Sequence, residues 1–293
     1  MSLAPQPALL GEVPLAARYL TWRIAPGTNR AGVLEALESL PIDAQIVVGL
    51  GAQLVSFCEA QVPGLRDAPA LHGPGVASPS TPTALWMWLL GSDRGELLHR
   101  TRTLALLLEE AFELIDVTEA FRYAEGRDLS GYVDGTENPE GDAAHRTAVA
   151  TQAGIAGSSF VAVQQWVHDL DALAALSPRE RDAIVGRRLS DNEEMDDAPP
   201  SAHVKRTAQE SFDPEAFVLR RSMPWSDPTG EGLVFVAFGK SFDAFETLLR
   251  HMLGLDDGIV DALLRFTTPI SSAYYWCPPV VDGQLDLTAL ERR

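Results

Sequence analysis

Three short segments of the chain carry the side chains best suited to chemistry. The segment 131–138 places Asp134 between glycines, and glycine lets backbone approach a flat ligand closely because it has no side chain to clash. His203 follows the irregular, acidic segment 190–200, and Arg220 lies further on in a short apolar stretch. A carboxylate, an imidazole and a fixed guanidinium suit proton transfer, axial iron ligation and stabilisation of negative charge.

Each of these side chains also has an ordinary structural interpretation. Asp134 and Gly135 form a frequent turn dipeptide, and a lone histidine after two prolines is often a surface or capping residue. Arg220 is equally compatible with an ion pair on an exposed strand. Because side chains alternate along a strand, we expect Arg221 to point away from Arg220, so that only one of them faces a cavity.

Composition limits the classes of partner. The chain has 293 residues, of which 46% are hydrophobic, so it is long enough to bury a substantial core. Its formal net charge of -18 repels phosphate backbones and anionic lipid surfaces, which argues against nucleic acid and membrane partners. The longest apolar stretches, such as 84–90, are too short to span a bilayer.

The two cysteines and the N-terminus indicate a reduced compartment. Cys58 and Cys277 have no paired ligand spacing, so we expect buried thiols rather than a disulfide or a zinc site. Residues 1–14 contain three prolines and no Lys or Arg, which is unlike an export signal. These features predict a cytoplasmic protein.

Periodicity predicts an α+β chain whose two halves follow the same plan. In the first half we expect strands at 17–24, 46–51 and 84–90 and helices at 29–40 and 104–115. The second half repeats this alternation: strands at 160–167, 217–221 and 233–239, a helix opened by the capping box of Ser177 and Glu180, and a helix at 241–253 that Gly254 ends. The irregular segments 125–143 and 190–200 read as loops.

The chemically suited segments resemble those of a known family. Residues 131–138 resemble the GxxDG motif of the dye-decolourising peroxidases. Residues 202–207 and 219–224 are similar to the proximal-histidine and distal-arginine segments of that family's B-type branch, and they occur in the family's order. The resemblance implies two ferredoxin-like subdomains with antiparallel sheets, residues 1–140 and 141–293, that enclose one haem b (iron protoporphyrin IX).

The resemblance also implies a role for particular residues. His203 would be the axial iron ligand, while Asp134, Arg220 and Ser222 would lie on the face where peroxide binds. Several relatives carry asparagine at the position of Ser222, and serine keeps a hydrogen-bonding group there but on a shorter side chain. Arg187 is similar to a family position near a haem propionate, although an arginine that stabilises a helix end is an alternative.

A carboxylate behind His203 would strengthen it as an iron ligand. Glu215 and Asp261 are both candidates, and the sequence does not choose between them. Most tryptophans, including Trp22, Trp86 and Trp166, read as core residues rather than radical sites.

The function that the resemblance implies is haem-dependent peroxidase activity. Hydrogen peroxide would be reduced, and organic donors such as dyes and phenolics would be oxidised in one-electron steps via a ferryl intermediate, by a protein that forms homo-oligomers. One alternative is a haem-binding protein for storage, delivery or iron release, which would need the axial ligand but no acid–base pair. Another is a cofactor-free dimeric α+β enzyme, which survives only if His203 does not bind iron.

Overall fold

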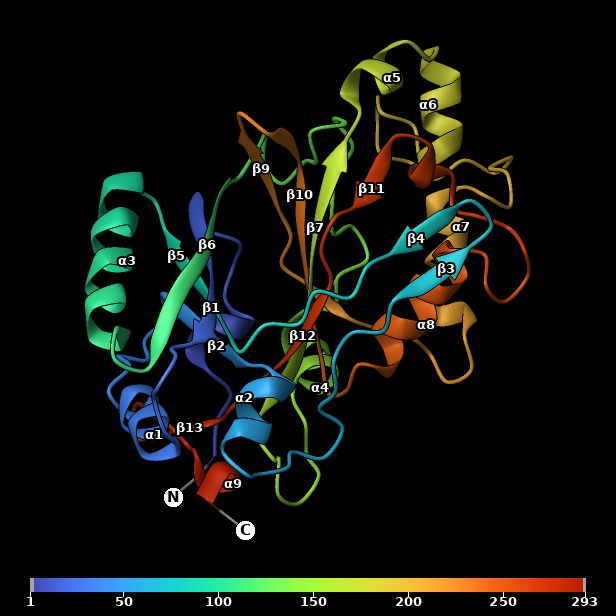
Figure 1. Ribbon diagram of the computed structural model, residues 1–293. Coiled ribbons are helices and arrows are strands. Elements are labelled where there is room, and N and C mark those ends of the chain that lie inside the picture. Colours follow the sequence, from blue (N-terminus) through green and yellow to red (C-terminus); the bar gives the residue numbers. More distant parts are fainter. Residues whose placement is uncertain (1–2, 292–293) are drawn as a thin grey trace.

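The computed structural model, which describes residues 3–291, is built around one continuous antiparallel sheet of ten strands (Figure 1). Eight of these strands form two halves of four strands each, which we call the first and the second sheet. The first has the order β2-β5-β1-β6 and the second the order β12-β7-β10-β9. The strands of the first sheet are β1 (Ala16–Ile24), β2 (Ile46–Leu50), β5 (Leu85–Gly91) and β6 (Phe112–Phe121). Those of the second are β7 (Ser159–His168), β9 (Met223–Asp227), β10 (Gly230–Gly239) and β12 (Ala273–Cys277). Numbered along the chain within each half, both sheets have the order 4-1-3-2.

The two sheets meet at both edges and so close a ring of strands. β6 joins β9 through the pair Ala120 and Trp225, and β2 joins β12 through the pair Leu50 and Trp276. By contrast, β7 and β10 pair along most of their length. The two junctions between the sheets are therefore the narrowest parts of the hydrogen-bonded ring, and we call them the seams.

Shorter elements extend this framework. Two short strands lie beside the second sheet, β8 (Leu219–Arg220) next to β10 and β11 (Thr267–Pro269) next to β7. Two small hairpins pair β3 (Leu71–Gly73) with β4 (Val76–Ser78) and β13 (Val280–Val281) with β14 (Gln284–Leu285). The shorter helices are α2 (Ala52–Phe57), α4 (Gly141–Ala148), α5 (Leu170–Ala174), α7 (His203–Arg206) and α9 (Thr288–Glu291).

Aromatic side chains fill the inside of the ring. Tyr19 stacks between Trp86 and Trp88 with ring centroids 6.1 and 6.2 Å apart, and Trp86 stacks on Tyr275 at 5.7 Å. All four are buried, which confirms that the strand tryptophans belong to the core. Such rings bury much apolar area and hold the two sheets at a fixed separation.

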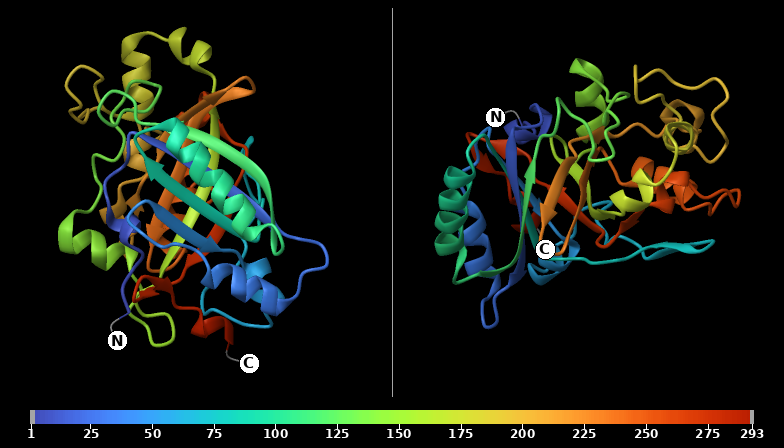
Figure 2. Two further views of the ribbon diagram at one scale, coloured as in Figure 1. Left: turned by 90° about the vertical axis from the view of Figure 1, so that its left-hand side faces the viewer. Right: turned by 90° about the horizontal axis from the view of Figure 1, so that it is seen from above.

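Helices cover the outer faces of the two sheets, on opposite sides of the ring (Figure 2). α1 (Arg30–Glu38) and α3 (Arg94–Leu108) lie on the first sheet, and α8 (Asp243–Met252) lies on the second. α6 (Pro178–Val185) begins at the expected capping box. No helix within residues 3–291 is long and apolar enough to cross a membrane. Both cysteines are buried free thiols, as expected.

Most predicted strands and helices are confirmed, but two predictions were wrong. The helix expected at 104–115 ends at Leu108, because the residues after it form β6, in which Phe112 pairs with Ile24. Tertiary pairing overrides the helical spacing of the apolar residues there. The strand expected at 217–221 is reduced to β8, and β9 follows it. β9 pairs with β10 along its length but with β6 at only one residue, which suits Pro224 because proline has no N–H to donate.

Candidate active site

The outer face of the second sheet and α8 enclose a cavity of about 380 Å³, which is within the size range of small-molecule sites. Its wall is largely apolar and includes Trp166 of β7, Phe235 of β10 and Leu249 of α8. Four of the five site residues expected from the sequence also line it: Asp134, Arg187, His203 and Arg220. The fold therefore brings together side chains that are far apart in the sequence.

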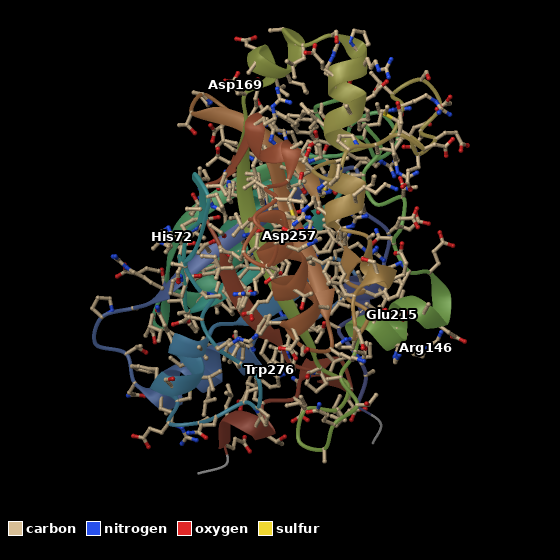
Figure 3. All side chains as sticks on the ribbon, turned by 90° about the vertical axis from the view of Figure 1, so that its right-hand side faces the viewer. His72, Arg146, Asp169, Glu215, Asp257 and Trp276 are labelled. Atoms are coloured by element: carbon tan, nitrogen blue, oxygen red, sulfur yellow. The ribbon has the colours of Figure 1, made fainter. Side chains whose placement is uncertain are left out.

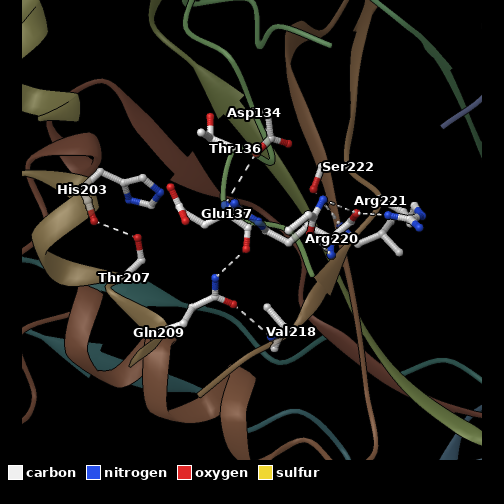
Figure 4. Close-up of polar contacts among 12 residues, drawn as sticks. Asp134, Thr136, Glu137, His203, Thr207, Gln209, Val218, Arg220, Arg221 and Ser222 are labelled. Atoms are coloured by element: carbon white, nitrogen blue, oxygen red, sulfur yellow. Dashed lines mark hydrogen bonds and ion pairs between the residues drawn. The ribbon is translucent and has the colours of Figure 1, made fainter. Parts of the chain in front are cut away.

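His203 is the first residue of α7 and is held from behind by a buried carboxylate. Its Nδ1 lies 2.8 Å from Oδ2 of Asp261, whose side chain is fully buried. The other oxygen of Asp261 accepts a hydrogen bond of 2.9 Å from the backbone N–H of Leu263. Within residues 3–291, Nε2 of His203 makes no hydrogen bond, and Figure 4 shows the ring directed toward the segment of Asp134 and Glu137. Nε2 is therefore free to bind a group in the cavity.

The structure settles which carboxylate supports His203. Asp261 does so, whereas the side chain of Glu215 lies at the surface (Figure 3). The sequence could not distinguish them because each is far from His203 along the chain.

An ion pair between the buried Arg206 and the exposed Asp257 fixes the short helix that carries His203. Arg206 donates hydrogen bonds of 2.7 and 2.8 Å to the two oxygens of Asp257, and a third of 2.6 Å to the carbonyl of His251. These hydrogen bonds hold the pKa of Asp257 well below its usual range. Gly186, with φ +89°, packs so closely that an added Cβ would lie 2.3 Å from Cγ2 of Val204. α7 is thus anchored at both of its sides.

Asp134 and Arg220 form a loose pair on the cavity wall. Nη1 of Arg220 lies 3.7 Å from Oδ1 of Asp134, and the side chains are 17% and 25% exposed, respectively. This separation exceeds a hydrogen bond, so both groups keep free hydrogen-bonding capacity. Nε of Arg220 is buried and has no partner within the described part of the chain. The pair can therefore bind a small polar molecule and share its protons and charge.

Ser222 and Arg221 lie away from the main cavity. Ser222 lines an adjoining hollow of about 70 Å³ together with Asp134 and Arg220, and its Oγ accepts a hydrogen bond of 3.4 Å from the N–H of Val236. Ser222 therefore lies beside Asp134 and Arg220 in this hollow, but it does not line the main cavity. Arg221 donates to the carbonyl of Leu10 at 3.3 Å, which confirms that it points away from its neighbour.

Arg187 lines the cavity and is already paired. Its Nη2 lies 2.9 Å from Oε1 of Glu137, and its Nη1 donates a hydrogen bond of 3.0 Å to the carbonyl of Asn192. The side chain is 14% exposed, so it has both the position and the charge to bind a carboxylate at the cavity edge.

The sequence analysis missed a second histidine–carboxylate pair on the cavity wall. Nε2 of His168 lies 3.0 Å from Oδ1 of Asp128, and its Nδ1 lies 2.6 Å from Oγ1 of Thr267. The N–H of Ser130 donates to the other oxygen of Asp128 at 2.7 Å. Burial opposes ionisation of Asp128, but the hydrogen bonds from His168 and Ser130 outweigh it and lower its pKa. The alternation of Gln164, Trp166 and His168 along one face of β7 was the available signal.

We expect Asp128→Asn to destabilise the protein at pH 7 by about 1–3 kcal/mol, because it removes a charged hydrogen-bond acceptor from a buried site. Since folding lowers the pKa of Asp128, its contribution is complete above the unfolded-state pKa of about 3.9 and disappears as the pH falls below it. Urea unfolding of wild type and variant between pH 7 and pH 3 measures this. The exposed Asp67→Asn is the control, and a stability difference that does not narrow with falling pH contradicts the prediction.

Comparisons with known proteins agree with this geometry. The family model described as Dyp-type peroxidase, C-terminal, matches residues 125–282. The chain is 35% identical to a dye-decolorizing peroxidase of Rhodococcus erythropolis, with 98% of this chain and 97% of the relative aligned. It is 32% identical to one of Mycolicibacterium paratuberculosis over 72% of this chain, an alignment that spans 62% of that relative.

Solved structures give the same result. DyPB from Rhodococcus jostii superposes with a TM-score of 0.86 at 29% identity, covering 94% of this chain and 96% of that chain. A dye-decolorizing protein from Vibrio cholerae superposes with a TM-score of 0.85 at 28% identity, covering 99% of each chain. A variant of the Rhodococcus jostii protein was solved in complex with heme, and it superposes with a TM-score of 0.85 at 28% identity over 94% of this chain and 96% of that chain.

Proposed function

Since the chain belongs to the Dyp-type peroxidase family, we propose that it binds haem b and reduces hydrogen peroxide while oxidising small aromatic donors in one-electron steps. The observation that carries this proposal is the convergence of His203, backed by Asp261, with the pair of Asp134 and Arg220 on one cavity. The first supplies an iron ligand and the second an acid–base and charge-stabilising pair.

The residues present fit haem. The cavity is mostly apolar, as a porphyrin face requires. One imidazole nitrogen of His203 is held by a carboxylate, and the other has no partner within the described residues. Arg187 and Arg220, whose buried Nε has no partner among residues 3–291, supply positive charge for propionates or for a bound anion. The complex of the Rhodococcus jostii variant with heme supports the same assignment.

The protein's own groups would then divide the work. Haem bound there would supply the redox chemistry, namely an iron centre able to take oxidising equivalents from peroxide and give them up one at a time. Asp134 takes a proton from one oxygen of hydrogen peroxide and returns it to the leaving oxygen, directly or through a water molecule. Arg220 stabilises the negative charge that develops as the O–O bond breaks. Asp261 fixes the orientation of His203, and the apolar residues of α8 limit the access of water.

We also propose that the two halves of the ring are ferredoxin-like subdomains, residues 1–140 and 141–293, that assemble into a homo-oligomer. The common strand order 4-1-3-2 supports the duplication. Haem storage or delivery is the second candidate function. It is less well supported, because a storage site has no use for a carboxylate and a guanidinium that face each other with free hydrogen-bonding capacity.

Reconstitution with haem tests the proposal. We expect an absorption spectrum of histidine-ligated ferric haem that changes rapidly when one equivalent of hydrogen peroxide is added in a stopped-flow mixer, and then recovers with an aromatic donor. Haem that binds but does not react with peroxide favours storage, and failure to bind haem excludes both functions.

We expect Asp261→Asn to weaken haem affinity or peroxidase activity by about 10–100-fold, because the carboxylate that orients His203 is replaced by a neutral amide. Glu215→Gln is the matched control, since it makes the same chemical change on an exposed residue. Haem dissociation rates and the ferric absorption spectrum provide the measurement. Equal behaviour of the two variants would show that Asp261 does not act through His203.

A further inference from the structure

Two amide side chains, Asn138 and Gln209, tie the segment that carries Asp134 to the strand that carries Arg220. We propose that they are positioning residues that set the separation between Asp134 and Arg220. This inference rests on the proposed function, because it assigns them a part in the reaction with peroxide.

Asn138 acts as a substitute strand partner for Arg220. Its Nδ2 donates a hydrogen bond of 3.0 Å to the carbonyl of Arg220, and its Oδ1 accepts one of 2.8 Å from the N–H of the same residue. β8 pairs with β10 on its other edge, so the amide occupies the edge that would otherwise lack a partner. The backbone of Arg220 is thereby held on both sides.

A tight turn links Asn138 to Asp134. The N–H of Asn138 donates to the carbonyl of Gly135 at 3.0 Å, and Gly135 has φ +77°. A Cβ at Gly135 would lie 2.9 Å from Nδ2 of Asn138, so the side-chain amide packs directly on the glycine. The position of Asp134 relative to Arg220 therefore follows from this turn and the two hydrogen bonds of Asn138.

Gln209 makes a second connection, and its amide is buried. Its Nε2 donates to the carbonyl of Glu137 at 3.2 Å, and its Oε1 accepts from the N–H of Val218 at 3.0 Å (Figure 4). Gln209 begins a short 3-10 helix just after α7, the helix of His203. Gln209 therefore links the segment that carries His203 to the segments that carry Asp134 and Arg220.

The ion pair itself is too weak to hold this arrangement. Asp134 and Arg220 are both partly exposed and 3.7 Å apart, and such pairs contribute little to stability. The four hydrogen bonds of Asn138 and Gln209 join neutral groups, so salt does not screen them as it screens an ion pair. They maintain the geometry whichever charge the site carries during the reaction.

Gln6 provides a matched control. It is buried and makes the same kind of contacts, donating to the carbonyls of Val48 and Pro278 at 2.8 and 3.1 Å and accepting from the N–H of Val48 at 2.7 Å. Val48 lies on β2 and Pro278 directly follows β12, and neither lines the cavity. Gln6→Ala thus reports what the loss of a buried amide does to the fold alone.

The first test uses haem-free protein. We expect Asn138→Ala to speed hydrogen exchange of the Arg220 amide at least about tenfold, because its acceptor is lost. Gln6→Ala should leave that amide unchanged. If Asn138→Ala does not fold, Gln209→Leu is tested through the Val218 amide instead. Unchanged protection of the tested amide overturns the inference whether or not the protein is a peroxidase.

The second test uses haem-loaded protein. We expect Asn138→Ala to slow the reaction with hydrogen peroxide about 10-fold or more, with haem affinity and the KM for the aromatic donor within about twofold of wild type. In an Arg220→Leu background, Asn138→Ala should cause no further loss, because the guanidinium whose distance from Asp134 it sets is absent. Equal slowing in both backgrounds, or by Gln6→Ala, overturns the inference. A wild-type protein that binds haem but ignores peroxide instead overturns the proposed function.

Discussion

Replacing His203 with Ala should abolish histidine ligation of haem and reduce peroxidase turnover by more than about 100-fold. Loss of a residue that only hydrogen-bonds to a metal ligand costs up to roughly 100-fold, and loss of the ligand itself should cost more. The reason is geometric, because His203 lines the cavity and Asp261 holds its Nδ1, while its Nε2 has no partner in the described part of the chain. The ferric absorption spectrum of the reconstituted variant, followed by peroxide mixing, is the measurement.

Two controls separate ligation from general damage. His72→Ala removes an exposed imidazole on β3 (Figure 3) and should leave spectrum and turnover unchanged. Added imidazole should restore part of the spectrum of His203→Ala, since it fills the space that the side chain leaves. A wild-type spectrum in His203→Ala without imidazole would exclude this residue as the ligand.

The second large effect concerns the reaction with peroxide. We expect Arg220→Leu to slow it by roughly 10²–10³, the cost of removing one charge-stabilising donor, and Asp134→Asn by roughly 10²–10⁴, the contribution of acid–base catalysis. Both variants should still bind haem, because His203 and Asp261 are unchanged. Stopped-flow rates under excess peroxide measure the loss.

Arg221→Leu is the matched control for Arg220→Leu. The two arginines are adjacent, but Arg221 donates to the carbonyl of Leu10 and points away from the cavity. Its replacement should change the rate by less than about threefold. If the two leucine variants react equally slowly, the loss arises from the strand and not from the guanidinium in the cavity.

The residue types of the site were readable from the sequence, but most of its contacts were not. Asp134, His203 and Arg220 stood out because their types suit chemistry and their segments resemble one family. The hydrogen bond between His203 and Asp261 joins residues that 57 others separate, and no local pattern reports such a contact. The pair of Asp128 and His168 was overlooked for the same reason.

Local signals predicted individual elements well where propensity and tertiary structure agree. The capping box of Ser177 and Glu180 marks the start of α6, and Gly254 ends α8 with φ +68°. The prediction was wrong where strand pairing determines the secondary structure. The apolar residues at the start of β6 have the spacing of a helix, but they form a strand because they pair with β1. Ring closure could not be predicted, because the seams join segments that only the finished fold brings together.

The seams also bear on how this chain is made. A ribosome releases β2 long before it releases β12, the strand that pairs with it through Leu50 and Trp276. During that interval Leu50, at the end of β2 and buried in the finished fold, exposes a strand edge that Trp276 later covers. An apolar strand edge of this kind recruits other chains, so aggregation competes with closure of the ring until the C-terminal strand is in place.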